Sequence, residues 1–153
     1  MKLVIVSGRS GSGKSTALHQ LEDLGYYCVD NLPVALLPEL VATFRDDVEE
    51  RPVRLAVGID ARNRIGDLTR YESIAQLLHE QGCEPEIVFL DARDDILLAR
   101  FSSTRRRHPL SNKDRSLEEA LAYERELLEP FTQRADLRLD SSSLSVHDLR
   151  EVL

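Results

Sequence analysis

The 153-residue sequence has only two cysteines, Cys28 and Cys83, and no apolar run long enough to cross a membrane. Neither cysteine lies at the spacing of a metal site, so we expect both thiols to be reduced and buried, as is usual in cytosolic proteins. A membrane-spanning helix needs about 18 consecutive apolar residues. Met1 and Lys2 lead directly into a short apolar run and do not begin a signal peptide. These absences predict a cytoplasmic protein that makes no contact with membranes.

Positive charge is also in short supply. The sequence has 20 Lys and Arg against 27 Asp and Glu, which gives a net charge of −7. A chain of this charge repels a phosphate backbone, so contact with nucleic acid would require a local basic patch. Internal repeats, low-complexity tracts and linkers are absent as well. Because 42% of the residues are hydrophobic, we expect residues 1–153 to form one domain with a single substantial core.

Short apolar runs alternate along the sequence with segments of helical periodicity. Strands are predicted at residues 3–6, 26–29, 53–59, 87–90 and 135–139. Helices are predicted at 14–24, 36–44, around 74–78, at 95–105, from Ser116 through Leu128, and from Ser145 onward. Strands separated by helices predict an α/β fold, in which a parallel five-stranded sheet carries helices on both faces. The chain ends inside the last predicted helix, so we expect it to be part of a longer protein.

Residues 8–15, GRSGSGKS, match the phosphate-loop pattern G-x-x-x-x-G-K-[ST] between the first predicted strand and the first predicted helix. Glycine allows consecutive backbone N–H groups to wrap around a phosphate, and the helix N-terminus favours an anion. Lys14 places a charge on the outer phosphates, and the Ser15 hydroxyl is a ligand for Mg²⁺. We therefore predict that ATP or GTP binds, with Mg²⁺, to Gly8, Arg9, Ser10, Gly11, Ser12, Gly13, Lys14 and Ser15.

A carboxylate at the end of a neighbouring strand is expected to hold the water shell of the metal. Asp30, Asp60 and Asp91 each follow a predicted strand, where an Asp can equally well be a turn or helix cap. Asp60 is favoured for the metal, because a strand that follows one intervening βα unit commonly returns beside the first. Asp91 is the alternative. Asp30 instead is placed to orient or deprotonate the hydroxyl of a phosphoryl acceptor.

The basic patch consists of Arg100, Arg105, Arg106, Arg107 and His108. Such a run is often a solvated helix face. Here it follows a predicted helix and precedes a polar loop, which is where kinases with a phosphate loop carry a mobile lid. We therefore predict that Arg105 and Arg106 contact the nucleotide phosphates and act in catalysis together with Lys14 and Asp30. His108, beside Pro109, is interpreted as a loop residue.

The sequence resembles the N-terminal domain of the RapZ/YvcJ family, P-loop nucleotide-binding proteins known as RNase adapter proteins. The motifs that carry the resemblance are VSGRSGSGKS at 6–15, YCVDNLP at 27–33, IDARN at 59–63, FLDA at 89–92 and TRRRHPL at 104–110. The resemblance implies an adenylate-kinase-like P-loop NTPase fold, with ATP at the phosphate loop and GTP bound with help from Asp60, Ala61, Arg62 and Asn63.

The resemblance also implies a C-terminal domain that this chain lacks and that carries most of the RNA binding. In enterobacterial members the full protein binds small regulatory RNA, presents one to a ribonuclease, and so regulates glucosamine-6-phosphate synthase. A homo-oligomer of the full-length protein is expected.

Three functions remain open at this point. A regulatory nucleotide-binding module with weak NTP hydrolysis is favoured over a small-molecule kinase of the adenylate or gluconate kinase type. The stretch between Asp30 and Val53 offers Arg45, Arg51 and Arg54 but no evident acceptor pocket. A structural or oligomerisation module with a relict loop would have no nucleotide affinity.

Overall fold

The computed structural model describes residues 1–45, 53–60, 70–104, 108–110 and 116–142. Within them, one parallel sheet is formed in the order β2-β3-β1-β4-β5. The strands are β1 (Lys2–Gly8), β2 (Tyr27–Val29), β3 (Arg54–Ile59), β4 (Glu86–Asp91) and β5 (Leu137–Asp140). The predicted α/β class and five-stranded parallel sheet are confirmed.

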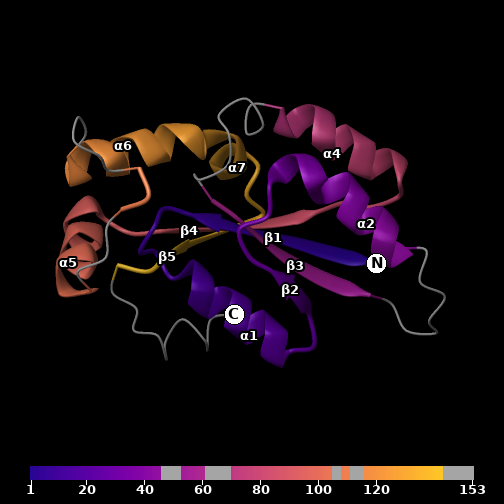
Figure 1. The fold of residues 1–153 in the computed structure, drawn as a ribbon, viewed down its shortest axis with the longest axis horizontal. Coiled ribbons are helices and arrows are strands. Elements are labelled where there is room, and N and C mark those ends of the chain that lie inside the picture. Colours follow the sequence, from indigo (N-terminus) through magenta and orange to yellow (C-terminus); the bar gives the residue numbers. More distant parts are fainter. Residues whose placement is uncertain (46–52, 61–69, 105–107, 111–115, 143–153) are drawn as a thin grey trace.

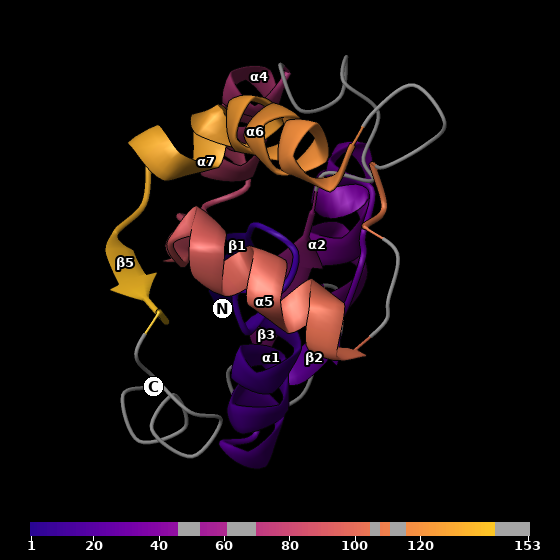
Figure 2. The same cartoon turned by 90° about the vertical axis from the view of Figure 1, so that its left-hand side faces the viewer.

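Helices cover both faces of this sheet (Figure 1). They are α1 (Lys14–Asp23), the 3-10 turn η1 (Val34–Leu36), α2 (Leu37–Arg45), α4 (Tyr71–Glu80), α5 (Asp94–Thr104), α6 (Leu117–Leu127) and α7 (Glu129–Gln133). One face carries α2, α4, α6 and α7, and the other carries α1. Figure 2 shows α5 across the end of the sheet that faces the viewer. None of the helices in the described ranges combines the length and hydropathy that a bilayer crossing requires.

Strand β1 is apolar from Leu3 to Val6 because both of its faces are buried there. Leu3 and Ile5 pack into a core formed with η1, α2, α4 and α7, whereas Val4 and Val6 pack against α1. Successive side chains of a strand point to opposite faces, so a strand in the middle of a covered sheet must be apolar at every position. The carboxyl end of β1 is thereby held at the centre of the sheet.

The helix predicted from Ser116 through Leu128 corresponds to α6. Its start is confirmed, since the Ser116 hydroxyl accepts a hydrogen bond from the Glu119 N–H at 3.2 Å. Its predicted end is confirmed as well, since α6 stops at Leu127 with Leu128 as its C-cap, and a separate helix, α7, begins at Glu129. Pro130 has no N–H to continue the helical ladder and belongs in the first turn of a new helix. The helix predicted from Ser145 lies outside the described residues.

Candidate functional site

The phosphate loop, residues 8–15, joins β1 to α1 with a backbone that depends on glycine. A Cβ on Gly8 would come within 2.3 Å of the Leu90 carbonyl oxygen. Gly11 and Gly13 have φ angles of 89° and 106°, in the left-handed region that other residues rarely adopt. The Ser12 N–H closes a turn on the Arg9 carbonyl at 3.1 Å. The loop therefore has the compact shape needed for a cradle of backbone N–H groups.

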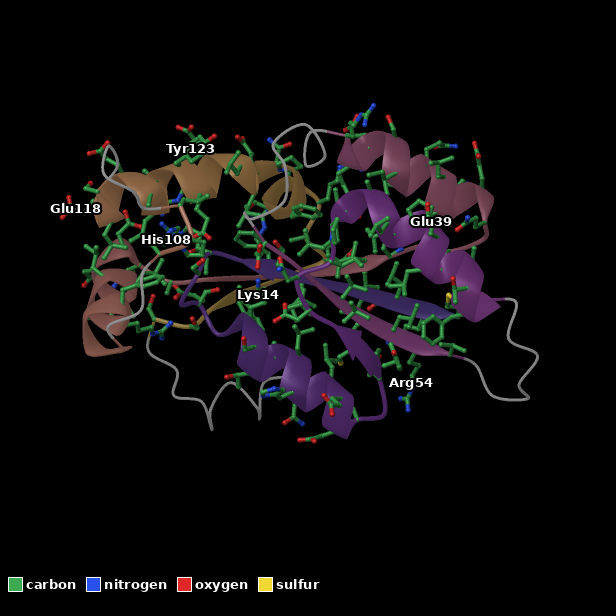
Figure 3. All side chains as sticks on the ribbon, viewed as in Figure 1. Lys14, Glu39, Arg54, His108, Glu118 and Tyr123 are labelled. Atoms are coloured by element: carbon green, nitrogen blue, oxygen red, sulfur yellow. The ribbon has the colours of Figure 1, made fainter. Side chains whose placement is uncertain are left out.

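Lys14 and Asp60 meet at the carboxyl end of the sheet. Lys14 Nζ lies 2.9 Å from Asp60 Oδ2, and Asp60 is only 4% exposed. The contact forms because β3 pairs directly with β1, so that Asp60 follows the strand beside the loop. Figure 3 labels Lys14 at the start of α1. Ser15, the next residue of α1, is exposed at the same helix end. The predicted adjacency of Asp60 and the loop is confirmed.

Asp91 also lies beside the loop, because β4 pairs with the other edge of β1. Its carboxylate is engaged by Arg9, whose Nε donates to Asp91 Oδ1 at 2.8 Å. The buried Arg9 guanidinium also donates to Asp94 Oδ1 and to the Ala92 carbonyl, each at 2.7 Å. The Arg9 side chain thus anchors the loop to β4 and α5. A contact from Arg9 to a ligand would have to come from its backbone.

The contact between Arg9 and Asp94 shifts the pKa values of both groups. Burial alone would lower the pKa of Arg9, but the hydrogen bonds and charges of Asp91 and Asp94 outweigh it and raise that pKa further. The Arg9 hydrogen bond lowers the pKa of Asp94 against a smaller effect of burial, and the charges of Arg9 and Arg125 add to the lowering. Each partner therefore stabilises the charged form of the other.

Two further side chains support the loop at its carbonyl groups. Arg100 Nη1 donates to the Gly11 carbonyl at 2.7 Å and to the Ser141 hydroxyl at 3.1 Å. The Ser141 hydroxyl donates to the Ser12 carbonyl at 2.6 Å. Arg100, which the sequence places in the basic patch, is therefore a support of the loop. Ser141 follows β5, and no local pattern in the sequence marks it as part of the site.

A buried carboxylate completes the support from the side of α6. Glu124 is fully buried. Its Oε1 accepts from the Ser10 N–H at 2.8 Å, and its Oε2 accepts from the Ser10 hydroxyl at 2.7 Å. His108 lies in a loop, as predicted, but its ring is buried and its Nε2 is 3.0 Å from Glu124 Oε1. Glu124 could not be predicted as a site residue, because in the sequence it is one more charge on an amphipathic helix.

Asp30, like Asp60, lies at the carboxyl end of its strand. It follows β2, is exposed, and accepts a hydrogen bond at Oδ1 from the Asn31 N–H at 2.7 Å. A Cβ on Gly58 of β3 would come within 2.5 Å of this oxygen. Glycine at position 58 thus allows the Asp30 carboxylate to pack against β3, two residues before Asp60.

Of the remaining residues named from the sequence, most lie outside the described part of the chain. Ala61, Arg62, Asn63, Arg105, Arg106 and Arg107 lie outside the described residues, as do Arg51 and the side chain of Arg45. Arg54 begins β3 and lies 5.2 Å from the Tyr26 ring centroid. Figure 3 shows it well away from Lys14, so it does not belong to the carboxyl-end site.

The oxygen ligands at the loop suit a Mg²⁺ ion that is shared with a nucleotide. They do not suit a metal ion bound by protein side chains alone. The described part of the chain contains no group of three or more His, Cys, Asp or Glu that could hold a metal ion. Ser15 and Asp60 supply a hydroxyl and a carboxylate. Mg²⁺ in nucleotide sites commonly takes one or two such oxygens and completes its shell with phosphate and water.

The sequence model of the RapZ-like N-terminal domain matches residues 1–153. The chain belongs to the RapZ-like family. Proteins named "Nucleotide-binding protein" from Hahella chejuensis and Alcanivorax borkumensis are each 54% identical to this RapZ-like domain, over 99% and 100% of it. The matches cover 53% and 54% of those relatives. The RapZ-like domain thus spans about half of their length.

Solved structures with little sequence identity share the fold of the RapZ-like domain. Shikimate kinase from Acinetobacter baumannii, in complex with shikimate, superposes with a TM-score of 0.61 at 15% identity, covering 99% of this chain and 90% of that one. A sugar kinase from Janibacter has a TM-score of 0.60 at 19% identity, covering 99% and 91%. The fold is that of the P-loop kinases.

Proposed function

We propose that this domain binds a nucleoside triphosphate with Mg²⁺ at residues 8–15 and hydrolyses it weakly, as a regulatory module. The observation that carries the proposal is the Lys14–Asp60 ion pair beside a loop whose shape requires glycine. An ammonium and a carboxylate next to a phosphate cradle have direct uses in nucleotide binding. The names of the relatives support the same conclusion.

Each residue has a defined role in this proposal. Lys14 neutralises the outer phosphates, Ser15 would hold Mg²⁺ directly, and Asp60 would stand behind it. Mg²⁺ supplies charge neutralisation on the phosphates when it is bound. ATP is taken at the loop, and GTP additionally uses Asp60, Ala61, Arg62 and Asn63. Arg105 and Arg106 contact the phosphates from the lid, and Asp30 is kept as the candidate base.

Titration of the 153-residue chain with fluorescent ATP and GTP analogues tests the proposal. We expect saturable binding that unlabelled triphosphate displaces and that EDTA weakens, since part of the phosphate charge is then uncompensated. Adenosine, which lacks phosphates, is the matched control and should not compete at equal concentration. A folded chain without affinity for either triphosphate would support a structural module with a relict loop and overturn the proposal.

For the longer protein we propose the role of a cytoplasmic RNase adapter that binds small regulatory RNA, presents it to a ribonuclease and assembles as a homo-oligomer. The acidic charge of this half supports placing the RNA contact in the other half. In a gel-shift assay, the longer protein should bind a small regulatory RNA, whereas this chain at equal concentration should not. Binding by this chain alone would move the RNA site into it.

A small-molecule kinase is the second candidate, and Asp30 is the observation that favours it. Its exposed carboxylate lies at the carboxyl end of the sheet, in a place that Gly58 leaves open. A screen of hydroxyl-bearing metabolites for triphosphate-dependent phosphorylation tests this candidate. Gly58→Ala would displace the Asp30 carboxylate, so a true kinase should lose transfer while keeping nucleotide affinity. Turnover of one specific acceptor would replace the regulatory proposal.

A further inference from the structure

Ser10 and the buried residues Glu124 and His108 form a hydrogen-bonded chain that reaches from the phosphate loop to the segment after α5. Both carboxylate oxygens of Glu124 accept from Ser10, at 2.8 and 2.7 Å, although the two residues are 114 positions apart. Oε1 is shared with His108 Nε2 at 3.0 Å. Neither the Glu124 nor the His108 side chain is more than 1% exposed. Figure 3 labels His108 beneath α6.

The neighbours of His108 assign its tautomer. The Leu110 N–H donates to His108 Nδ1 at 3.0 Å, so Nδ1 acts as an acceptor and carries no proton. The proton of the neutral ring then resides on Nε2, which donates to Glu124. Glu124 thereby accepts three hydrogen bonds, two from Ser10 and one from His108. A buried ionised carboxylate is tolerated where donors of this kind surround it, and it becomes costly when one is removed.

His108 reaches the loop by a second route as well. Its ring centroid lies 5.2 Å from that of Phe101 in α5. The Phe101 ring in turn lies against Gly11, where an added Cβ would be 3.5 Å from Phe101 Cε2. One imidazole thus supports two consecutive residues of the loop, Ser10 through a hydrogen-bonded carboxylate and Gly11 through a packed ring.

We infer that Glu124 and His108 are positioning residues that couple nucleotide binding at the loop to the segment around residues 108–110. The inference rests on the proposed nucleotide site. The hydrogen-bonded chain connects Ser10 of the loop to residues 108–110, which follow α5. Coupling between two places is reciprocal. Nucleotide binding must therefore change the environment of His108, and loss of the His108 contact must weaken nucleotide binding.

Nitrogen NMR of the labelled 153-residue chain tests the first half of the coupling. Without nucleotide we expect the His108 ring to show the neutral Nε2–H tautomer, and the Ser10 amide proton to be shifted downfield by its carboxylate acceptor. Mg²⁺-ATP should move both signals at the same concentration that fills the site, whereas adenosine should not. Binding of ATP with unmoved His108 signals would overturn this inference alone. Failure of the wild-type chain to bind ATP would overturn the proposed function and this inference together.

Substitution at position 108 tests the second half. His108→Ala should weaken Mg²⁺-ATP binding about tenfold, because it removes the contacts of His108 with Glu124 and Phe101. His108→Gln can still donate to Glu124 through its amide and should recover most of the affinity. His79→Ala is the matched control, since His79 is exposed and pairs only with Glu84 among the contacts described. Equal affinity of a folded His108→Ala chain and wild type would overturn the inference. Should that variant not fold, the wild-type NMR result decides.

Discussion

The Lys14 ammonium and the Asp60 carboxylate, 46 positions apart in the sequence, lie 2.9 Å from one another between the start of α1 and the end of β3. The pair depends on a sheet order in which β3 lies directly beside β1. A triphosphate with its metal brings an anion for Lys14 and a cation for Asp60. When such a ligand binds, Lys14 can pair with a phosphate in place of Asp60, and Asp60 can face the metal in place of Lys14.

Lys14→Ala should remove most of the triphosphate affinity while the chain stays folded. The substitution deletes the charge that faces the outer phosphates, and it also deprives the buried Asp60 of one ionic partner. We expect a small fall in melting temperature alongside the loss of binding in a fluorescent-nucleotide titration. Lys2→Ala, an exposed lysine at the opposite end of β1, is the control. Unchanged binding by the folded variant would remove the phosphate-loop assignment.

Asp60→Asn should weaken binding more than Asp91→Asn, and only in the presence of Mg²⁺. Residues behind metal ligands typically contribute 10- to 100-fold to affinity, so we expect an effect of about tenfold. Asp91→Asn should act mainly on stability, because that carboxylate faces Arg9. The measurement is the ratio of dissociation constants with Mg²⁺ and with EDTA. A reversed order of the two variants would transfer the metal role to Asp91.

Arg9→Met should lower the free energy of unfolding by about 3 kcal/mol, the scale on which a buried ion pair responds to the loss of one partner. The guanidinium is fully buried and donates to Asp91, Asp94 and the Ala92 carbonyl, none of which methionine can satisfy. Urea denaturation gives the difference. Arg93→Met removes an exposed arginine that pairs with Asp95 and should change stability by less than about 1 kcal/mol. Equal losses of stability in the two variants would show that the buried contacts of Arg9 do not stabilise the fold.

The stabilising effect of Asp94 should disappear in acid. Arg9 lowers the pKa of this carboxyl in the folded chain below its value of about 3.9 in the unfolded one. The ionised form is therefore favoured by folding, and its contribution is complete above pH 4 and lost as the pH falls through the lowered pKa. Wild type should be more stable than Asp94→Asn at pH 7 and at pH 5, with the gap closing toward pH 2. A gap that widens in acid would contradict the sign of the shift.

Arg105→Ala and Arg106→Ala should each weaken triphosphate binding about tenfold, the value of one charge-assisted hydrogen bond of roughly 1.5–3 kcal/mol. The prediction comes from the sequence, since both residues lie outside the described part of the chain. Hydrogen exchange with a non-hydrolysable triphosphate should show protection from residue 103 to residue 115. Arg93→Ala, an exposed residue at the start of α5, is the control. Protection confined to residues 8–15 would point instead to a surface for a partner.

The sequence was sufficient for those parts of the site that local patterns encode. The loop is written in eight consecutive residues, and apolar runs that each end in an aspartate predicted where Asp60 would lie once the order of the strands was inferred. The supports of the loop could not be predicted in this way. Glu124 and Ser141 contact Ser10 and Ser12 across 114 and 129 positions, and neither differs in its local sequence from an ordinary surface residue. The contacts of the Arg9 side chain could not be predicted either, because the phosphate-loop pattern allows any residue at that position.

The supports of the phosphate loop have a consequence for the order in which the protein is made. The loop is synthesised before Arg100, Glu124 and Ser141, which all lie in the second half of the chain. A nascent chain that has exposed residues 1–90 already carries the whole nucleotide signature, yet it lacks every one of these three contacts. The full set of supports is therefore in place only after residue 141 has been made, when β5 joins the outer edge of the sheet and Ser141 reaches the Ser12 carbonyl.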